Sequence, residues 1–337
     1  MYTKFSKPFN DILKIKSDFF SNNDLLLKNN DKLLKIYKTQ PIRINCKNCG
    51  YKLNKRHNFI NHKIKYKVCK KCSHINGNFE DTQKYNEFCY KPKNNNYIKF
   101  YEKSFNDRVK KIYSPKTQFL IDFFKTQKVK NIKVLDIGCG LGHFLKSLEN
   151  KNIKAIGVET NPMMVKLGNS KLKKNKIFFS EDLDTLNMIK ETDSNIISMI
   201  SVLEHLNNPN EFLKYIKKSK AKFLYASIPM MSLSVLMENL FQNVFPRHLA
   251  ATHTHIYTEK SIKYLLSKFK MKIVAEWWFG TDFLDMYRSM QLNLKKNKSE
   301  LNLYLNNYIL KNIDSFQRII DKNKVSSELH FIAKIKN

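Results

Sequence analysis

The segment that most constrains this chain of 337 residues is Val134-Leu-Asp-Ile-Gly-Cys-Gly-Leu-Gly142. An apolar strand pattern leads into three glycines, and a helical pattern follows them. Gly138, Gly140 and Gly142 allow positive φ and close approach of a ligand to the backbone. Glu159 stands 21 residues after Gly138, at the end of the next strand pattern, where a carboxylate can accept both ribose hydroxyls. The segment therefore predicts a nucleotide-like ligand on a sheet.

Asp136 bears on which ligand this is, because both NAD and S-adenosylmethionine suit a glycine-rich turn. Its carboxylate lies inside the strand just before the glycines, where it would repel a pyrophosphate but can orient the ammonium group of S-adenosylmethionine. The glycine spacing also departs from the Gly-x-Gly-x-x-Gly of dinucleotide sites. We therefore expect S-adenosylmethionine as the cofactor.

Strand and helix patterns alternate along most of the chain, which predicts an α/β fold with a mostly parallel sheet covered on both faces. The predicted strands are 132–137, 154–159, 176–180, 195–201, 222–228, 271–278 and 328–335. The predicted helices are 9–38, 97–127, 142–150, 162–173, 209–219 and 258–269, with further helices in 283–322. Residues 230–256 interrupt this alternation, and their apolar spacing predicts an amphipathic helical insertion that serves as a substrate lid.

Four segments resemble the class I methyltransferase family, in the family's order and within roughly residues 115–280. They are Val134–Gly142, Gly157–Asn161, Phe179–Leu183 and Ser201–Pro209. The resemblance implies a Rossmann-like, seven-stranded methyltransferase sheet whose last strand, Leu329–Ile335, runs antiparallel to the rest. It also implies methyl transfer from S-adenosylmethionine.

The resemblance further implies which residues contact the cofactor. Glu159 would bind the ribose, and either Asp182 or its neighbour Glu181 would face the adenine amine. Val202 or Leu203 would pack near the cofactor.

Four of the six cysteines form two Cys-x-x-Cys pairs, Cys46/Cys49 and Cys69/Cys72. Each pair can present two thiolates from a tight turn, and two such turns complete a four-thiolate zinc site. A redox role is the alternative, but neither pair has the strand–helix pattern of a thioredoxin-like motif. We expect structural zinc, because four thiolates close the metal's shell and leave no open position for catalysis.

The predicted organisation is a helical lead over 1–40, a zinc ribbon over 41–95 and a methyltransferase domain over 96–337. This order resembles the ribbon-bearing methyltransferases associated with sugars and surface polysaccharides. The resemblance implies transfer to a hydroxyl or carbon of a small polar acceptor, such as a sugar, a sugar nucleotide or a glycan.

Histidines near the predicted strand ends are candidates for the base that removes a proton from the acceptor. Glu204-His205 directly follows the predicted strand 195–201, although this pair can also be a scaffold of the cofactor pocket. His253 and His255 lie in a polar loop after the insertion and can contact substrate, hold the lid or pack. Thr258 and Ser261, which follow, give only half of a capping box.

The net charge of +32 raises the alternative of nucleic-acid binding and an RNA methyltransferase. We do not favour it, because lysine is spread over the whole chain and arginine, the preferred residue for bidentate phosphate contacts, is scarce. A non-catalytic binding protein with a degenerate methyltransferase fold is a second alternative, opposed by the intact glycine loop. No apolar run is long enough for a membrane span or a signal peptide, so we expect a cytoplasmic protein. The oligomeric state is left open.

Overall fold

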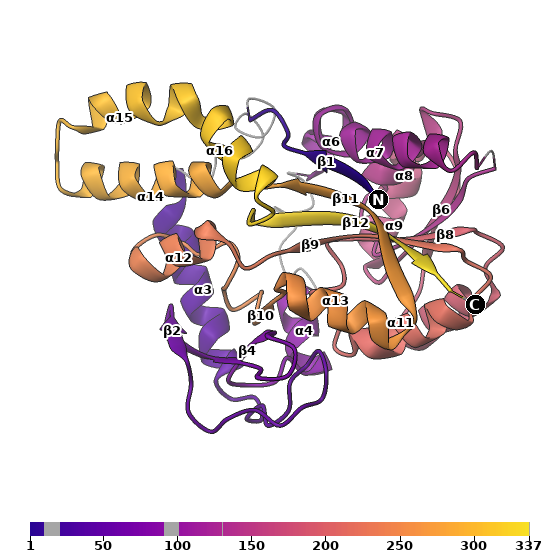
Figure 1. The fold of residues 1–337 in the computed structure, drawn as a ribbon, viewed down its shortest axis with the longest axis horizontal. Coiled ribbons are helices and arrows are strands. Elements are labelled where there is room, and N and C mark those ends of the chain that lie inside the picture. Colours follow the sequence, from indigo (N-terminus) through magenta and orange to yellow (C-terminus); the bar gives the residue numbers. More distant parts are fainter. Residues whose placement is uncertain (10–20, 91–100, 130, 337) are drawn as a thin grey trace.

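The computed structural model describes residues 1–9, 21–90, 101–129 and 131–336, and its centre is an eight-stranded sheet (Figure 1). The strand order is β1-β11-β12-β9-β8-β5-β6-β7. The strands are β1 (Tyr2–Phe5), β5 (Lys133–Ile137), β6 (Lys154–Glu159), β7 (Ile177–Phe179), β8 (Ile196–Ile200), β9 (Phe223–Pro229), β11 (Met271–Phe279) and β12 (Glu328–Ile335).

Seven of these strands confirm the predicted Rossmann-like sheet. The neighbouring pairs from β7 through β6, β5 and β8 to β9 are all parallel, whereas β12 lies antiparallel between β9 and β11. Parallel strands buried on both faces read as nearly continuous apolar runs, which is why their bounds could be predicted closely.

Helices between the strands cover both faces of the sheet. They are α8 (His143–Glu149), α9 (Pro162–Leu172), α10 (Asp182–Glu191), α11 (Pro209–Lys218) and α13 (Glu259–Lys268). Asn161 and Asn208 cap α9 and α11 with their side chains, and a proline follows each cap, which fixes where these helices begin. Helix α10 was not predicted, because Leu186 and Ile189 are its only buried large apolar residues.

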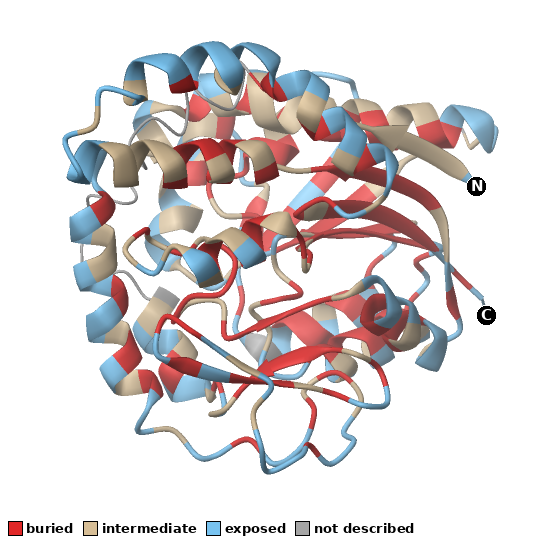
Figure 2. Ribbon diagram, turned by 60° about the vertical axis from the view of Figure 1, so that its left-hand side comes forward, coloured by how far each residue is buried: buried red, intermediate tan, exposed pale blue. Residues whose placement is uncertain are grey.

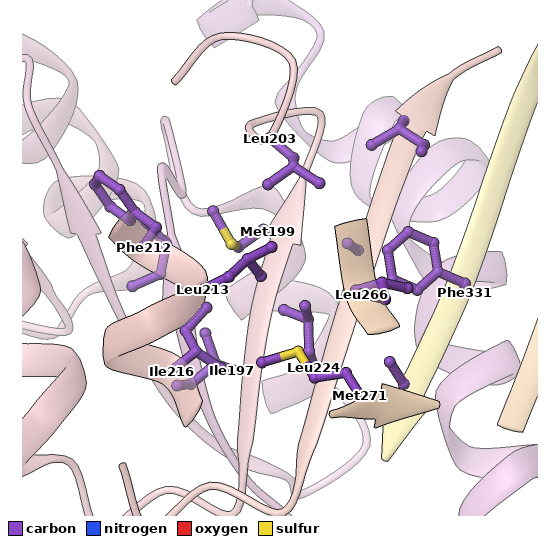
Figure 3. Close-up of a cluster of buried hydrophobic side chains, with 14 of the residues drawn as sticks. Ile197, Met199, Leu203, Phe212, Leu213, Ile216, Leu224, Leu266, Met271 and Phe331 are labelled. Atoms are coloured by element: carbon purple, nitrogen blue, oxygen red, sulfur yellow. The ribbon is translucent and has the colours of Figure 1, made fainter. Parts of the chain in front are cut away.

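Two apolar cores lie on opposite faces of the sheet, and Figure 2 shows the central strands buried between helices with exposed outer surfaces. One core packs β8 and β9 against α11 and α13, with Met199, Leu213, Leu224 and Leu266 among its residues (Figure 3). The other packs Phe119 and Phe123 of α7 (Ser114–Thr126) against the opposite face.

The N-terminal part departs from the predicted helical lead. β1 pairs in parallel with β11, from Tyr2 opposite Ala275 to Phe5 opposite Trp278, and so adds an eighth strand at the sheet edge. Four residues are too few to give a strand signal in the sequence. Of the predicted helix 9–38, α3 (Asn23–Tyr37) is observed, and residues 10–20 lie outside the described residues, as do 97–100 of the predicted helix 97–127.

The cysteine-bearing segment forms a second sheet, in the order β10-β4-β3-β2. It contains β2 (Phe59–Asn61), β3 (Ile64–Val68) and β4 (Ile75–Gly77), and α4 (Gln83–Tyr90) follows. β10 (His255–Ile256) completes this sheet although it lies far away in the sequence, because His255 pairs with Asn76. The domain bounds 41–95 and 96–337 stay a prediction, but the two parts share a sheet.

The insertion at 230–256 contains a helix, α12 (Leu233–Leu240), and continues as a loop over residues 241–254. Pro246 and the buried carboxylate of Glu238 give the physical reason. Glu238 accepts hydrogen bonds from the backbone N–H groups of Arg247 at 2.6 Å, His248 at 2.8 Å and Leu249 at 3.0 Å. These three N–H groups donate to the Glu238 side chain and not to helical carbonyl groups, and the bonds fix the conformation of the loop.

Three helices precede the last strand, as expected: α14 (Asp282–Lys296), α15 (Asn302–Tyr308) and α16 (Ile313–Lys322). Within the described ranges, none of the helices combines the length and the apolar character that crossing a membrane requires.

Candidate active site and metal centre

The glycine loop follows β5 and uses positive φ at Gly138 (66°), Gly140 (55°) and Gly142 (77°). A Cβ on Gly138 would lie 2.7 Å from Cγ2 of Val202, and one on Gly142 would lie 2.9 Å from Cδ1 of Ile177. A Cβ on Gly140 would meet no described atom within 4 Å. Gly138 and Gly142 therefore serve packing, whereas Gly140 borders open space that a ligand can enter.

Glu159 ends β6 beside this space. Its carboxylate accepts hydrogen bonds from the N–H groups of Gly140 at 2.9 Å and Asn161 at 3.0 Å. Burial raises the pKa of Glu159, and these hydrogen bonds oppose that rise. The Glu159 carboxylate, which we predicted to accept hydrogen bonds from a ribose, thus lies next to Gly140 and the open space beside it.

Asp136 is buried in β5 and accepts a hydrogen bond of 2.6 Å from Oγ of Ser198. Burial raises the pKa of Asp136 to about 7, despite that hydrogen bond. A buried carboxylate with a raised pKa gains stabilisation from a neighbouring cation. Asp136 therefore suits the ammonium group that the sequence predicted for it.

The adenine side of the predicted site is less closed. Glu181 is exposed and occupies the N-cap position of α10, and Asp182 begins the helix, but the side chain of Asp182 lies outside the described residues. The side chain of Leu183 is 76% exposed. Val202 packs over Gly138, whereas Leu203 has no exposed surface and belongs to the core, so Val202 is the better placed of the two predicted cofactor contacts.

Sequence reasoning missed an aromatic cover over the glycine loop. His143, directly after Gly142, stacks with Phe105 at 4.6 Å and with Tyr113 at 5.3 Å between ring centroids. Tyr113 ends the π-helix Val109–Tyr113, which continues α6 (Phe105–Arg108). Single-turn π-helices recur at functional sites, but they leave no periodic signal in a sequence. Burial lowers the pKa of His143 to about 3 and keeps its ring neutral.

Beyond β8, the turn Ser201–His205 brings two predicted bases together. The ring centroids of His205 and His253 lie 4.9 Å apart. Nδ1 of His253 lies 3.0 Å from the carbonyl oxygen of Arg247, so Nδ1 carries the hydrogen and Nε2 is the unprotonated nitrogen. Burial lowers the pKa of His253 to about 4 and that of His205 well below its usual value. Both rings are therefore neutral near pH 7, as a general base must be.

His255 has a different environment from the other two candidates. It is 1% exposed, and its ring nitrogens lie 3.0 Å from His74 and 2.9 Å from the carbonyl oxygen of Glu204. Both ring nitrogens of His255 already have protein partners, so the molecule that accepts the methyl group could not reach either of them. The environment of His255 therefore does not suit a base.

Glu204, in the same turn, and Lys116, whose charge opposes the raised pKa of Glu204, add two buried titratable groups to the site. Oε2 of Glu204 is buried without a hydrogen-bond partner among the described residues, and burial raises the pKa of this carboxyl to about 8. Lys116, on α7, is buried with its Nζ 3.8 Å from Glu328. Sequence reasoning missed Lys116, because α7 is far from the strand ends in the sequence.

The four predicted zinc ligands converge in the second sheet. All four Sγ atoms lie within 4.8 Å of one another, with Cys46 and Cys72 at 3.7 Å and Cys49 and Cys69 at 3.5 Å. Tetrahedral zinc with Zn–S bonds of about 2.3 Å requires sulfur atoms roughly 3.8 Å apart, so the cluster fits that ion.

The two cysteine turns share one backbone conformation, which explains the convergence. The N–H of Gly50 donates to the carbonyl of Cys46, and the N–H of Ser73 donates to that of Cys69, both at 2.8 Å. Gly50 and Ser73 both have positive φ.

Amide groups around the cluster support thiolates. Asn48 donates to Sγ of Cys72 at 3.5 Å, and Asn76 donates to Sγ of Cys46 at 3.6 Å. Such donors stabilise negative charge on sulfur and orient the ligands.

The sheet order, the glycine loop and Glu159 define a Rossmann-like methyltransferase fold. Residues 105–276, half of the chain, match the family described as "Methyltransferase domain", and the chain belongs to this family.

One curated relative is the ubiquinone biosynthesis O-methyltransferase of Pelagibacter ubique (strain HTCC1062), 28% identical over 87 residues. The match covers 26% of this chain and only 36% of that protein. Among solved structures, a SAM-dependent methyltransferase from Archaeoglobus fulgidus is 22% identical, with a TM-score of 0.43 over 71% of this chain and 99% of that one. A second, from Clostridium acetobutylicum, is 12% identical, with a TM-score of 0.46 over 74% and 100%.

Proposed function

We propose that this protein transfers a methyl group from S-adenosylmethionine to a hydroxyl or carbon of a small polar acceptor. One observation carries the proposal. The turn Ser201–His205 contacts the glycine loop through Val202 and presents His205 three residues later, and the N–H of His205 bonds back to the carbonyl of Val202 at 2.8 Å. A single hydrogen-bonded turn therefore connects the predicted cofactor site with a candidate base.

S-adenosylmethionine, when bound, supplies an electrophilic methyl group. Glu159 would hold the ribose hydroxyls, Asp136 would face the ammonium group, and the open side of Gly140 would admit the cofactor. Fixing the cofactor in this way lowers the entropic part of the barrier to an in-line attack.

The neutral His205 and His253 would accept the acceptor's proton. The cofactor would supply the methyl group and its sulfur would keep the bonding electron pair, so the protein has to remove only the acceptor's proton. Nε2 of His253 is the unprotonated nitrogen available for the proton. Glu204, in this turn, and the buried Lys116, whose charge acts on Glu204, are suited to bind hydroxyl groups of the acceptor.

We propose a sugar or sugar nucleotide of surface-polysaccharide biosynthesis as the acceptor and one zinc ion as the ligand of the four cysteines. The order of ribbon and methyltransferase domain supports the sugar. The Pelagibacter relative is an O-methyltransferase, and this similarity supports a hydroxyl acceptor.

Incubation with labelled S-adenosylmethionine and separate pools of sugar nucleotides, glycans and total RNA tests the proposal. We expect label in a sugar-containing pool and none with Glu159→Ala, with the exposed Glu191→Ala as the matched control. Label in RNA alone would overturn the acceptor class. Calorimetry without any S-adenosylmethionine binding would overturn the whole proposal.

A further inference from the structure

We propose that His74, in the cysteine-bearing sheet, is a positioning residue for methyl transfer, acting through His255 on the Glu204-His205 turn. This inference rests on the proposed function, because it concerns the same candidate base. It assigns a second task to the ribbon besides holding a metal.

The contact runs through two buried imidazoles. Nε2 of His74 lies 3.0 Å from Nδ1 of His255, and Nε2 of His255 lies 2.9 Å from the carbonyl oxygen of Glu204. His74 is 0% exposed and His255 is 1% exposed, so solvent does not compete for these bonds. The two rings thus form a dry bridge from the ribbon to the residue next to His205.

The hydrogen positions in this bridge follow from its end point. A carbonyl oxygen only accepts, so Nε2 of His255 carries a hydrogen. Burial and the nearby Lys47 cation lower the pKa of His255, and a neutral ring carries one hydrogen, so its Nδ1 accepts. Nε2 of His74 must then be the donor. Every bond in the bridge therefore has one direction, from His74 to the carbonyl of Glu204.

His74 is itself fixed by the second cysteine turn. Its carbonyl oxygen accepts from the N–H of Cys69 at 2.9 Å and from Nδ2 of Asn76 at 3.0 Å. Asn76 pairs with His255 in the strand register, which holds His255 beside β4, the strand that begins directly after His74. A displacement of the cysteine turn would therefore displace the ring of His74.

The turn that receives this support needs it. Ser201, a residue other than glycine, has a positive φ of 55°, which is backbone strain that the surroundings must hold in place. Asn86, on α4, donates to the carbonyl of His205 at 3.1 Å. The N-terminal part thus contacts the carbonyl of His205 directly, through Asn86, and that of Glu204 indirectly, through His255, and these contacts set where the candidate base points.

Two substitutions separate positioning from general stability. His74→Gln keeps an N–H donor near the position of Nε2, whereas His74→Leu keeps the bulk without a donor. We expect both variants to bind zinc and S-adenosylmethionine like the parent. We expect the Leu variant to lose roughly 10- to 100-fold in kcat, because a misplacement of about 1 Å can cost that much, and the Gln variant to recover most of the rate. His57→Leu, in the same ribbon, is the matched control and should leave the rate unchanged.

Equal rates for the Leu variant and the parent would overturn the proposal, as would a Gln variant as slow as the Leu variant. A Leu variant that loses zinc or cofactor affinity together with kcat would show a structural role instead. Nitrogen-15 NMR of the unsubstituted protein needs neither an acceptor nor a variant. It should show His74 and His255 both protonated at Nε2, and protonation of either ring at Nδ1 alone would exclude the bridge. A parent protein that binds cofactor and shows these tautomers, but methylates no acceptor, would contradict the proposed function and leave the bridge standing.

Discussion

The imidazole of His253 is the residue whose chemistry can be tested most directly. Its N–H points at the carbonyl of Arg247, and the loop around it is fixed by Glu238. We expect His253→Ala to lower kcat by about 10²- to 10⁴-fold, the usual contribution of a general base, while the Kd for S-adenosylmethionine stays unchanged. Single-turnover rates and calorimetry measure the two effects. If His253→Ala and His205→Ala both keep the full rate, neither is the base.

The pH dependence of kcat/KM tests the same ring in the intact protein. Burial lowers the pKa of His253 to about 4, and a base acts only in its neutral form. At saturating S-adenosylmethionine, kcat/KM for the acceptor should therefore be constant near neutral pH and fall as the pH drops through about 4, well below the usual histidine value of about 6.5. A fall centred near pH 6.5 would assign the base to an exposed group.

Asp136 makes a prediction about cofactor affinity. Its pKa of about 7 in the free protein means that the carboxyl is partly protonated at neutral pH, and only the ionised form attracts an ammonium group. The affinity for S-adenosylmethionine should thus rise with pH through about 7. Asp136→Asn should weaken binding and flatten this dependence in calorimetric titrations at several pH values. A pH dependence that persists in the Asn variant would place the titrating group elsewhere.

Among the elements, the strands of the parallel sheet could be predicted from apolar runs, and the helices after them from their caps and apolar spacing. β1 and β10 could not, because each is too short for a pattern and forms only by pairing with a distant strand. Ser261 is another case that could not be predicted from the sequence alone. Its hydroxyl accepts the N–H of Thr258 at 2.8 Å and completes a capping box that the sequence had indicated only by half.

Some residues of the candidate site could also be predicted from the sequence, and others could not. The glycines and Glu159 could be found because one strand–turn–helix unit and the end of the next strand contain them. The contact of His74 with His255 spans 181 positions, and the stack on His143 depends on a π-helix, so neither is visible in any local pattern. Burial also decided against His255 as a base, which the sequence alone could not show.

The four-cysteine element should lose its structure when the metal is removed, since a segment of this size has too small a core to stay folded by itself. We expect one zinc per chain. Chelation, or Cys49→Ser, should raise amide hydrogen exchange in β3, β4 and β10 and leave β5 and β6 protected. Unchanged exchange in β4 after complete metal loss would show that the ribbon does not depend on zinc.

At the scale of the whole molecule, β1 ties the N-terminus to the sheet edge, where Nε1 of the buried Trp277 donates to the carbonyl of Ser6 at 3.0 Å. Removal of residues 1–6 would expose this edge and the indole. We expect a lower Tm, by about 2–4 °C for each kcal/mol lost, and a red-shifted tryptophan emission. A truncated protein with the Tm and emission of the full chain would show that β1 is dispensable.

The pairing of β1 with β11 and of β4 with β10 also sets an order of events during synthesis. Domains usually fold from the N-terminus as the chain leaves the ribosome. Here Tyr2 cannot pair with Ala275, nor Asn76 with His255, until those later residues have been synthesised. Strand β1 therefore reaches its final partner only after most of the methyltransferase sheet has been made. The cysteine turns must likewise persist until β10, the strand that completes their sheet, has been made.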